Sequence, residues 1–338
     1  MAGLFDIENR RYIGNKTKLN DWIIQTVKQY TNNVSSFCDI FSGTGTVAKH
    51  ALPYFSTIII NDFLYSNRVI YGAFFEQGEF NMDKLHCLID EFNTRDYKAD
   101  NWFSLNYGNL YFDIGVARKA GAIRMQIENM KDELTYKEYC ILLASLIYSL
   151  DRLANTVGHF ESYIKKPIER KKLYVRLVNA RSFDNVKIYR EDANVLARQI
   201  NADVVYIDPP YNSRQYSRFY HVYETLVKWD KPQLFGVARK PEPENMSEYC
   251  RSSAPSFFLD LIQHLNARYI VVSYNNTYNS HSKSSLNKIT LEQIKSTLEM
   301  RGKTTILTHR YSAFNAGKTD LKNHQEYLFF TKIKNNIL

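Results

Sequence analysis

The most informative part of the chain reads Asp203-Val204-Val205-Tyr206-Ile207-Asp208-Pro209-Pro210-Tyr211. Its four apolar residues form a short run bounded by proline, which predicts a buried strand that ends abruptly. Pro210 favours extended geometry at Pro209, so we expect a stiff loop rather than a helix after the strand. Ligands of open α/β sheets bind at the carboxyl ends of the strands, and this loop is therefore a candidate binding site.

The groups in this loop suit the binding of a planar amine. An exocyclic NH2 group offers two donors, and Asp208 with the Pro209 carbonyl offers two acceptors, while neither proline supplies a competing N–H. The ring of Tyr211 provides a face on which a heterocycle can stack. The alternative interpretation is an ordinary turn after a core strand.

Asp-Pro-Pro-Tyr at residues 208–211 resembles the active-site motif of amino-methyltransferases that act on adenine N6. The chain is similar to type II, D12-class (Dam-like) adenine-specific DNA methyltransferases. The resemblance implies an α/β fold of the Rossmann-like, S-adenosylmethionine-dependent methyltransferase type, with a seven-stranded, mostly parallel sheet and a helical inserted target-recognition domain. It also implies that the catalytic residues are Asp208, Pro209, Pro210 and Tyr211.

A glycine-containing loop matches the cofactor loop of that family, F-x-G-x-G. Phe41-Ser42-Gly43-Thr44-Gly45 follows Asp39 and an expected strand over residues 37–41. The glycines permit a tight turn and the close approach of a ligand to the backbone. A dinucleotide-binding fingerprint would require a third glycine at position 48, which is Ala48.

The run of residues 57–63 supplies a second expected strand that ends in an acid. Asp62 stands where nucleoside-binding sheets meet ribose hydroxyls, with helix capping as the alternative, and Phe63 follows it. The resemblance extends to Tyr12, Gly14 and Lys16 before the first strand, although a solvated Lys16 is the alternative there, and to Asp192 as the partner of the cofactor's adenine amino group. The predicted ligands of S-adenosylmethionine are Tyr12, Lys16, Asp39, Phe41, Gly43, Gly45, Asp62, Phe63, Asp192 and Asp208.

The middle of the chain has a different pattern. Strand-like alternation disappears between residues 71 and 188 and helical periodicity replaces it, above all over residues 136–153, where we expect a buried helix. The resembling family places its target-recognition domain in such an insertion. We therefore expect 1–70 to form the N-terminal part of the methyltransferase domain, 71–188 the DNA target-recognition domain, and 189–338 the remainder. That remainder carries the active site and a closing hairpin of residues 304–308 and 326–333 around a polar loop.

Positive charge is concentrated in one segment. Residues 160–190 carry nine Lys and Arg against three acids, a net of 9 − 3 = +6 out of +9 for the whole chain. Such a segment suits DNA phosphates, with a solvated basic loop as the alternative. Amide and imidazole groups just upstream suit base edges, and arginines among aromatic rings suit an unstacked duplex. The predicted DNA contacts are Asn155, His159, Lys165, Lys166, Arg170, Lys171, Lys172, Arg214 and Arg218.

Composition limits the class of protein further. A chain of 338 residues with 44% hydrophobic and 23% charged residues is typical of globular proteins, and a charge of +9 favours an anionic partner such as nucleic acid. Four cysteines without a C-x-x-C pair predict buried, reduced thiols, and we expect no disulfide framework and no metal site. Asp6 and Glu8 stand where a signal peptide requires basic residues. We expect a cytoplasmic protein without a membrane partner.

The expected function is site-specific transfer of a methyl group from S-adenosylmethionine to N6 of a flipped-out adenine in double-stranded DNA. The resemblance implies the modification half of a restriction-modification system, acting as a monomer beside a cognate restriction endonuclease. Three alternatives stay open: another planar amine (cytosine N4, RNA adenine or a protein glutamine), a non-catalytic nucleic-acid-binding protein with this fold, and a nicotinamide-dependent dehydrogenase. Asp208 argues against the cytosine and glutamine enzymes, whose motifs usually begin with Ser and Asn. The missing third glycine argues against the dehydrogenase.

Overall fold

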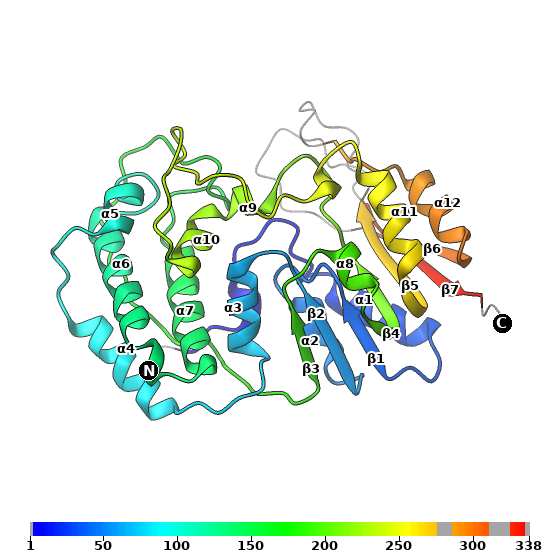
Figure 1. Ribbon diagram of the computed structural model, residues 1–338, viewed down its shortest axis with the longest axis horizontal. Helices are drawn as coiled ribbons and strands as arrows, with labels where there is room; N and C mark the ends of the chain where they lie inside the picture. The colour runs from blue at the N-terminus through cyan, green and yellow to red at the C-terminus, as the bar shows by residue number, and fades with distance from the viewer. Residues whose placement is uncertain (1–2, 276–285, 311–324, 335–338) are drawn as a thin grey trace. The chain divides into compact units, whose positions relative to one another are not determined.

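The structure, a computed structural model, describes residues 3–275, 286–310 and 325–334 and divides into two compact units (Figure 1). The helical unit consists of the N-terminal residues up to Asn15, Leu64–Ile188 and Tyr216–Glu244. The sheet unit consists of Lys16–Phe63, Tyr189–Gln215 and the residues from Asn245 onward.

Seven strands form one sheet in the order β3-β2-β1-β4-β5-β7-β6. Their bounds are β1 (Ser36–Asp39), β2 (Thr57–Asn61), β3 (Val186–Tyr189), β4 (Asn201–Ile207), β5 (Asn266–Asn275), β6 (Gly302–Arg310) and β7 (Gln325–Ile333). β1 pairs in parallel with β2 and β4, and β4 pairs in parallel with β5, whereas β7 runs antiparallel between β5 and β6. The predicted seven-stranded, mostly parallel sheet with its closing hairpin is confirmed. Residues 311–324 of the polar loop predicted within this hairpin lie outside the described residues.

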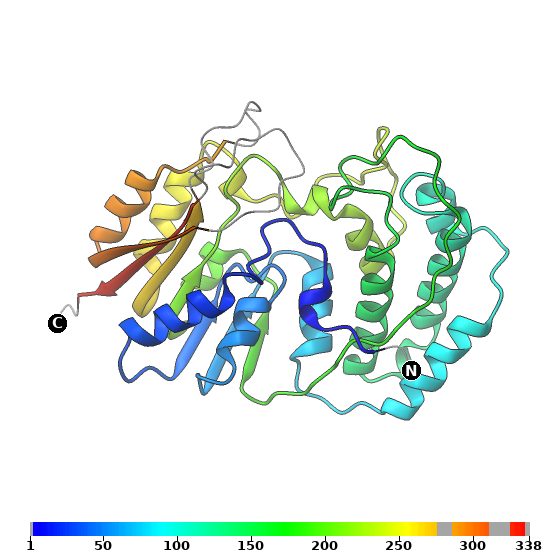
Figure 2. The same ribbon diagram turned by 180° about the vertical axis from the view of Figure 1, so that it is seen from behind.

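Helices cover both faces of this sheet. Alternate strand residues such as Val205 and Ile207 pack with α8 (Ala193–Ala197), α11 (Ala254–His264) and α12 (Leu291–Glu299), in front of the sheet in Figure 1. On the other face, seen in Figure 2, lies α1 (Asn20–Tyr30), whose Tyr30 ring is 5.3 Å from that of Phe330. The short helix α2 (Thr46–Ala51) follows the loop after β1. Because both faces are covered, the central strands consist of nearly continuous apolar residues.

The helical unit is built around α7 (Tyr136–Asp151), whose residues are almost all buried. A capping box between Thr135 and Glu138 starts this helix, which packs against α3 (Tyr65–Phe74) and α6 (Ile114–Asn129). The expected buried helix over 136–153 is therefore confirmed. The other helices of the unit are α4 (Met82–Thr94), α5 (Trp102–Tyr107), α9 (Tyr216–Phe219) and α10 (His221–Lys228), and short 3-10 helices in the chain are η1 (Ile7–Asn9), η2 (Lys131–Glu133) and η3 (Glu248–Cys250).

The division into units departs from the predicted boundaries 1–70, 71–188 and 189–338. The N-terminal residues and the segment 216–244 belong to the helical unit rather than to the sheet unit. Ring contacts of Tyr12 join these two segments, because its ring lies 5.3 Å from the Tyr216 ring and 4.6 Å from the Tyr220 ring. Glu224 adds a second link by accepting the backbone N–H of Tyr65 at 3.0 Å. The role of the helical unit in target recognition stays a prediction.

The cysteines differ in their exposure. Cys38, Cys140 and Cys250 are buried free thiols, whereas Cys87 is exposed on α4, contrary to the expectation for all four. None of the helices described here is long and apolar enough to cross a membrane. Within the described ranges, no group of three or more His, Cys, Asp or Glu side chains is placed to hold a metal ion.

Candidate active site

Asp208 follows the last residue of β4 and lies in a compact cluster of charged groups in the sheet unit. The Lys16 ammonium nitrogen is 3.0 Å from Asp208 Oδ1 and 3.3 Å from Glu326 Oε1. The Tyr211 hydroxyl donates to the Asp208 carboxylate, accepts from Lys16 Nζ at 2.9 Å, and lies 3.2 Å from Glu326 Oε1. Lys16 is 7% exposed and Glu326 1% exposed, so water screens these charges little.

The electrostatics of the cluster depend on one ammonium group shared by two carboxylates. Burial raises the pKa of Asp208, the charge of Lys16 opposes this rise, and the charge of Glu326 adds to it. When both acids are ionised, the three groups together carry one net negative charge. Asp208 is thus a hydrogen-bond acceptor in a negative, poorly solvated environment at the end of β4.

Tyr211 points its hydroxyl into the charged cluster. Its ring lies 4.4 Å from the Tyr274 ring at an angle of 58°, and its backbone carbonyl accepts from the Lys288 N–H at 2.8 Å. Pro209 is buried and Pro210 is half-buried beside it. The loop is therefore firmly held, as the two prolines predict. The stacking of a base on Tyr211 stays a prediction.

The glycine loop after β1 has the backbone geometry that only glycine adopts readily. Gly43 has φ 53° and Gly45 has φ 77°, both in the left-handed region. The Gly43 N–H donates to Asp62 Oδ2 at 3.0 Å, which joins the loop to the end of β2. The Ser42 hydroxyl donates to the Asp39 carbonyl at 2.6 Å. The structure therefore brings together the loop and the acid that the sequence assigned to one cofactor site.

Asn61 holds three segments of this region together, although no sequence motif pointed to it. Its side-chain N–H groups donate to the carbonyls of Ile40 and Glu191, both at 3.0 Å, and its oxygen accepts from the Glu191 N–H at 3.0 Å. It is 1% exposed and ends β2, directly before Asp62. The only signal in the sequence was a polar amide at the end of an apolar run.

Asp39 is a buried acid at the end of β1. It is 1% exposed, and neither of its carboxyl oxygens has a hydrogen-bond partner among the residues that the structure describes. Burial raises the pKa of Asp39 well above its ordinary value, and the charges of Asp208 and Asp62 add to this. Buried polar groups are nearly always satisfied, so this carboxyl fits a ligand that brings a cation or donors.

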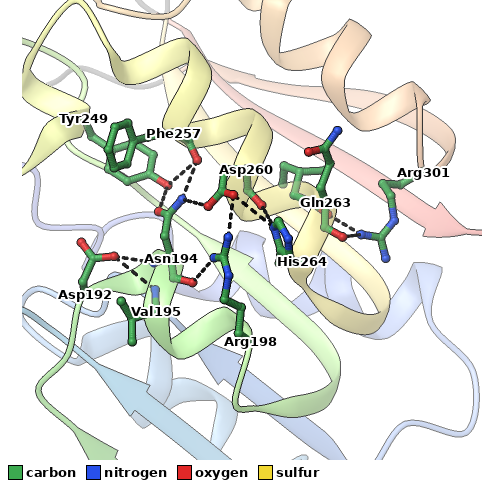
Figure 3. A network of polar contacts seen from close by, with 11 residues as sticks. Asp192, Asn194, Val195, Arg198, Tyr249, Phe257, Asp260, Gln263, His264 and Arg301 are labelled. Carbon is green, nitrogen blue, oxygen red and sulfur yellow. Dashed lines mark hydrogen bonds and ion pairs between the residues drawn. The ribbon is translucent and has the colours of Figure 1, made fainter.

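Asp192 has a structural task at the start of α8 (Figure 3). Its Oδ1 accepts the N–H groups of Asn194 at 2.9 Å and Val195 at 3.2 Å. The Asn194 amide in turn donates to Asp260 at 2.7 Å, which links α8 to α11. Two other predicted cofactor residues border the region, Phe41 with its ring 5.0 Å from that of Tyr249, and the half-buried Phe63. Their roles in binding a cofactor stay predictions.

Several residues assigned to ligands are engaged within the helical unit. Tyr12 stacks on Tyr216 and Tyr220 there, rather than belonging to the sheet unit with Lys16. The Asn155 amide donates to the Ile164 carbonyl at 3.0 Å, and the Arg218 guanidinium donates to the Pro241 carbonyl at 2.6 Å. These donors support the unit's own backbone. Their predicted contacts with cofactor or DNA stay predictions.

The basic segment lies on the surface of the helical unit. Its five selected residues are exposed and lie in a stretch without regular secondary structure, namely Lys165, Lys166, Arg170, Lys171 and Lys172. His159, just before it, stacks on Phe219 with ring centroids 4.3 Å apart. Arg214 is half-buried and belongs to the sheet unit. Exposure of the lysines is compatible with a phosphate-binding segment and with a solvated loop.

Comparison with known proteins adds independent findings. Residues 12–289 match the family model of the D12 class N6 adenine-specific DNA methyltransferases. The type II methyltransferase M.CviAII of Paramecium bursaria Chlorella virus 1 is 32% identical, over 96% of this chain and 98% of that protein. M.NlaIII of Neisseria lactamica, also a type II methyltransferase, is 29% identical over 93% of this chain and 95% of that protein. Modification methylase LlaI of Lactococcus lactis subsp. lactis is 31% identical over 79% of this chain, which spans 46% of that longer protein.

The family match begins at Tyr12, includes the glycine loop and the Asp-Pro-Pro-Tyr loop, and ends after β5. Both loops lie at the carboxyl ends of neighbouring parallel strands, where an α/β sheet binds its ligands. The relatives extend the likeness over nearly the whole length of this chain. The chain thus belongs to the D12 class N6 adenine-specific DNA methyltransferases and is a relative of type II modification methylases.

Proposed function

We propose that this protein transfers a methyl group from S-adenosylmethionine to N6 of an adenine in double-stranded DNA, and that it modifies the sites of a restriction endonuclease. The observation that carries the proposal is the half-buried Asp208 after the end of β4, followed by two prolines and held with its Oδ1 3.0 Å from Lys16 Nζ. Family membership supports adenine as the target, and the type II methyltransferases among the relatives support the link to restriction. Action as a monomer and a cytoplasmic location stay predictions.

The residues of the sheet unit fit S-adenosylmethionine. Asp39 is a buried carboxyl without a partner among the described residues, which suits the positively charged methionine part of the cofactor. Asp62 would accept the ribose hydroxyls, and the left-handed Gly43 and Gly45 let the backbone approach closely. Asp192 would meet the adenine amino group. When bound, the cofactor supplies a methyl group activated by its sulfonium.

The chemical task of the protein is to make a poor nucleophile react. The lone pair of adenine N6 is delocalised into the ring, so the amine attacks slowly. Hydrogen bonds from N6–H to Asp208 and to the Pro209 carbonyl would favour the pyramidal form with a localised lone pair. The carboxylate would stabilise the positive charge that develops on N6, and N6 would then release one proton to water to give the neutral methylamine. The adenine must leave the duplex to reach these groups, at a cost of about a few kcal/mol, and stacking on Tyr211 would offset part of it.

Incubation with labelled S-adenosylmethionine and duplex DNA, followed by digestion to nucleosides, tests the proposal. We expect label in N6-methyl-2′-deoxyadenosine, and at least about 10²-fold less label with the Asp208→Asn variant. Parallel reactions with RNA, and chromatography that resolves N4-methylcytosine, distinguish the other planar amines. Label in either of those products, or binding to DNA without any transfer, would contradict the proposed function.

The basic segment provides the contact with DNA in this proposal. If Lys171 and Lys172 lie against phosphates, replacing both with Gln should reduce the slope of log K against log salt by about 0.9 for each phosphate that is no longer neutralised. Matched and unmatched duplexes should lose affinity equally, because phosphate contacts carry no sequence information. Gln at the exposed Lys98 and Lys295 is the matched control. An unchanged slope would support a solvated loop, and a loss confined to the matched duplex would indicate that these lysines read bases.

A further inference from the structure

Glu326 is a buried carboxylate to which neither the sequence motifs nor the proposed reaction gives a role. It lies near the start of β7, where antiparallel pairing places it opposite Asn275 of β5. The Ser273 hydroxyl of β5 donates to Glu326 Oε1 at 2.7 Å, and the same oxygen lies 3.3 Å from Lys16 Nζ. Burying an ionised carboxylate is unfavourable unless it is paired and hydrogen-bonded, and these contacts meet both conditions.

The charge balance of the cluster depends on this residue. If Asp208 were the sole carboxylate beside Lys16, the two would form a neutral pair, and Asp208 would be a weaker acceptor for an amine. Glu326 contacts the same ammonium nitrogen and also lies 3.2 Å from the Tyr211 hydroxyl. Lys16 is therefore divided between two acids, and the ionised cluster keeps a negative charge.

We propose that Glu326 is a positioning residue that keeps the Lys16–Asp208 cluster net negative where methyl transfer takes place. This inference rests on the proposed function. A negative cluster stabilises the cationic donor and the positive charge that moves from sulfur to N6, whereas the product S-adenosylhomocysteine carries a neutral thioether. Glu326 thus favours the donor over the product and strengthens Asp208 as an acceptor.

The variant Glu326→Gln isolates the charge. Gln has nearly the same size and retains an oxygen that can accept from the Ser273 and Tyr211 hydroxyls. Glu299→Gln removes one acid from the exposed surface of α12 in the same unit and is the matched control. Calorimetry on each folded variant measures the affinities for S-adenosylmethionine and S-adenosylhomocysteine separately. Circular dichroism and thermal unfolding establish that the variants are folded.

We expect Glu326→Gln to lower the ratio of donor to product affinity by about tenfold, the effect of one charge acting over several ångströms in a partly polar site. The kcat for methylation should fall by about tenfold or more, while KM for DNA stays unchanged. Glu299→Gln should change none of these values. An equal loss of affinity for both ligands, or an unchanged ratio, would show that Glu326 supports only the fold and would overturn the proposal.

A second variant keeps the proposal testable if the Gln variant does not fold. Glu326→Asp keeps the charge and shortens the side chain, so the affinity ratio should stay near that of the wild type while kcat falls. A lowered ratio in Glu326→Asp would overturn the assignment. Methylation of adenine by the wild-type protein tests the proposed function independently, so its success beside an unchanged ratio in Glu326→Gln would reject this inference alone.

Discussion

The two ends of β4 carry aspartates whose surroundings differ in kind. Asp203 lies near the start of the strand, where its Oδ2 accepts the backbone N–H groups of Ser35 at 2.7 Å and Ser36 at 3.1 Å, and its Oδ1 accepts from Arg268 at 3.1 Å. Asp208 follows the end of the strand, where it shares one buried ammonium with Glu326. Donors of the fold thus surround the Asp203 carboxylate, whereas the Asp208 carboxylate shares the Lys16 ammonium with Glu326.

Their pKa values move in opposite directions for this reason. Partial burial raises the pKa of Asp203, but hydrogen bonds from Ser35, Ser36 and Arg268 outweigh it and hold that pKa well below its ordinary value. Burial raises the pKa of Asp208, and the pairing with Lys16 only partly opposes it. Ionised Asp203 at the start of β4 therefore contributes to the stability of the folded protein. At the carboxyl end of β4, burial disfavours the ionised form of Asp208, so a ligand that donates hydrogen bonds or brings positive charge would stabilise it.

The sharpest test exchanges Asn for Asp at each end. Asp208→Asn presents an NH2 donor toward N6–H and removes the charge, so we expect methylation to fall by at least about 10²-fold with DNA binding retained. Asp203→Asn should keep nearly full activity at temperatures at which it is folded. Initial rates with labelled cofactor measure both variants. Near wild-type activity in Asp208→Asn would contradict the catalytic role proposed for Asp208.

Asp203→Asn, the variant with the smaller expected loss of activity, should show the larger loss of stability. Asp203→Asn loses charge-assisted hydrogen bonds that tie β1 and β5 to β4, and we expect it to lower the free energy of unfolding by about 1–2 kcal/mol at neutral pH. A folded pKa below the unfolded value means that this stability is present above about pH 4 and is lost as the pH falls toward the folded pKa. Urea unfolding at pH 7 and pH 3 measures both effects. A difference between wild type and Asp203→Asn that persists undiminished at pH 3 would contradict this account.

Other residues at the carboxyl edge extend the comparison. Asp62 follows β2 and accepts from the Gly43 N–H at 3.0 Å. We therefore expect changes at Asp62 and Gly43 to affect ligand binding, as at Asp208, more than the stability of the fold, as at Asp203. We expect Asp62→Ala to weaken S-adenosylmethionine binding by about tenfold, the scale of losing a hydrogen bond to a charged group. Gly43→Val should weaken it as well, because Gly43 has φ 53° and valine adopts such values only with strain. Calorimetry on folded variants decides, and unchanged affinity in both would place the cofactor elsewhere.

The sequence predicted this edge well because its signals are local. The apolar run before Asp208, the prolines after it and the two glycines near Asp39 each specify their own backbone, and the sheet aligns them. Glu326 could not be found in this way. Its place depends on β7 inserting between β5 and β6, a pairing of segments far apart in the chain. The sequence predicted a strand that begins at Glu326, but nothing in it indicated that this residue contacts Lys16.

The predicted DNA contacts illustrate another limit. Composition shows that Asn155 and Arg218 carry donors suited to bases or phosphates, but not which acceptors the fold supplies. In the structure the carbonyls of Ile164 and Pro241 each accept one of these hydrogen bonds, and the contacts with DNA stay predictions. Tyr12 likewise had a motif typical of a cofactor segment, yet its ring stacks with two tyrosines of the helical unit. Whether a polar or aromatic side chain faces a ligand or its own fold is decided by distant residues.

The smallest expected effect concerns pH and tests the Asp208 end alone. Protonated Asp208 cannot act as a charged acceptor, so activity should fall as the pH falls through its pKa, and burial places that limb above the range of an exposed aspartate. Among the residues that the structure describes, the charged and titratable groups that act on Asp208 include Lys16, Glu326, Tyr211, Asp39 and Tyr206. Among them Lys16 lowers the pKa of Asp208 and Glu326 raises it.

Glu326→Gln should therefore move the acid limb of kcat to lower pH, even though kcat itself falls. A limb that stays in place or moves to higher pH would show that Glu326 does not act on Asp208, and profiles of wild type, Glu326→Gln and Glu299→Gln in one buffer series decide this.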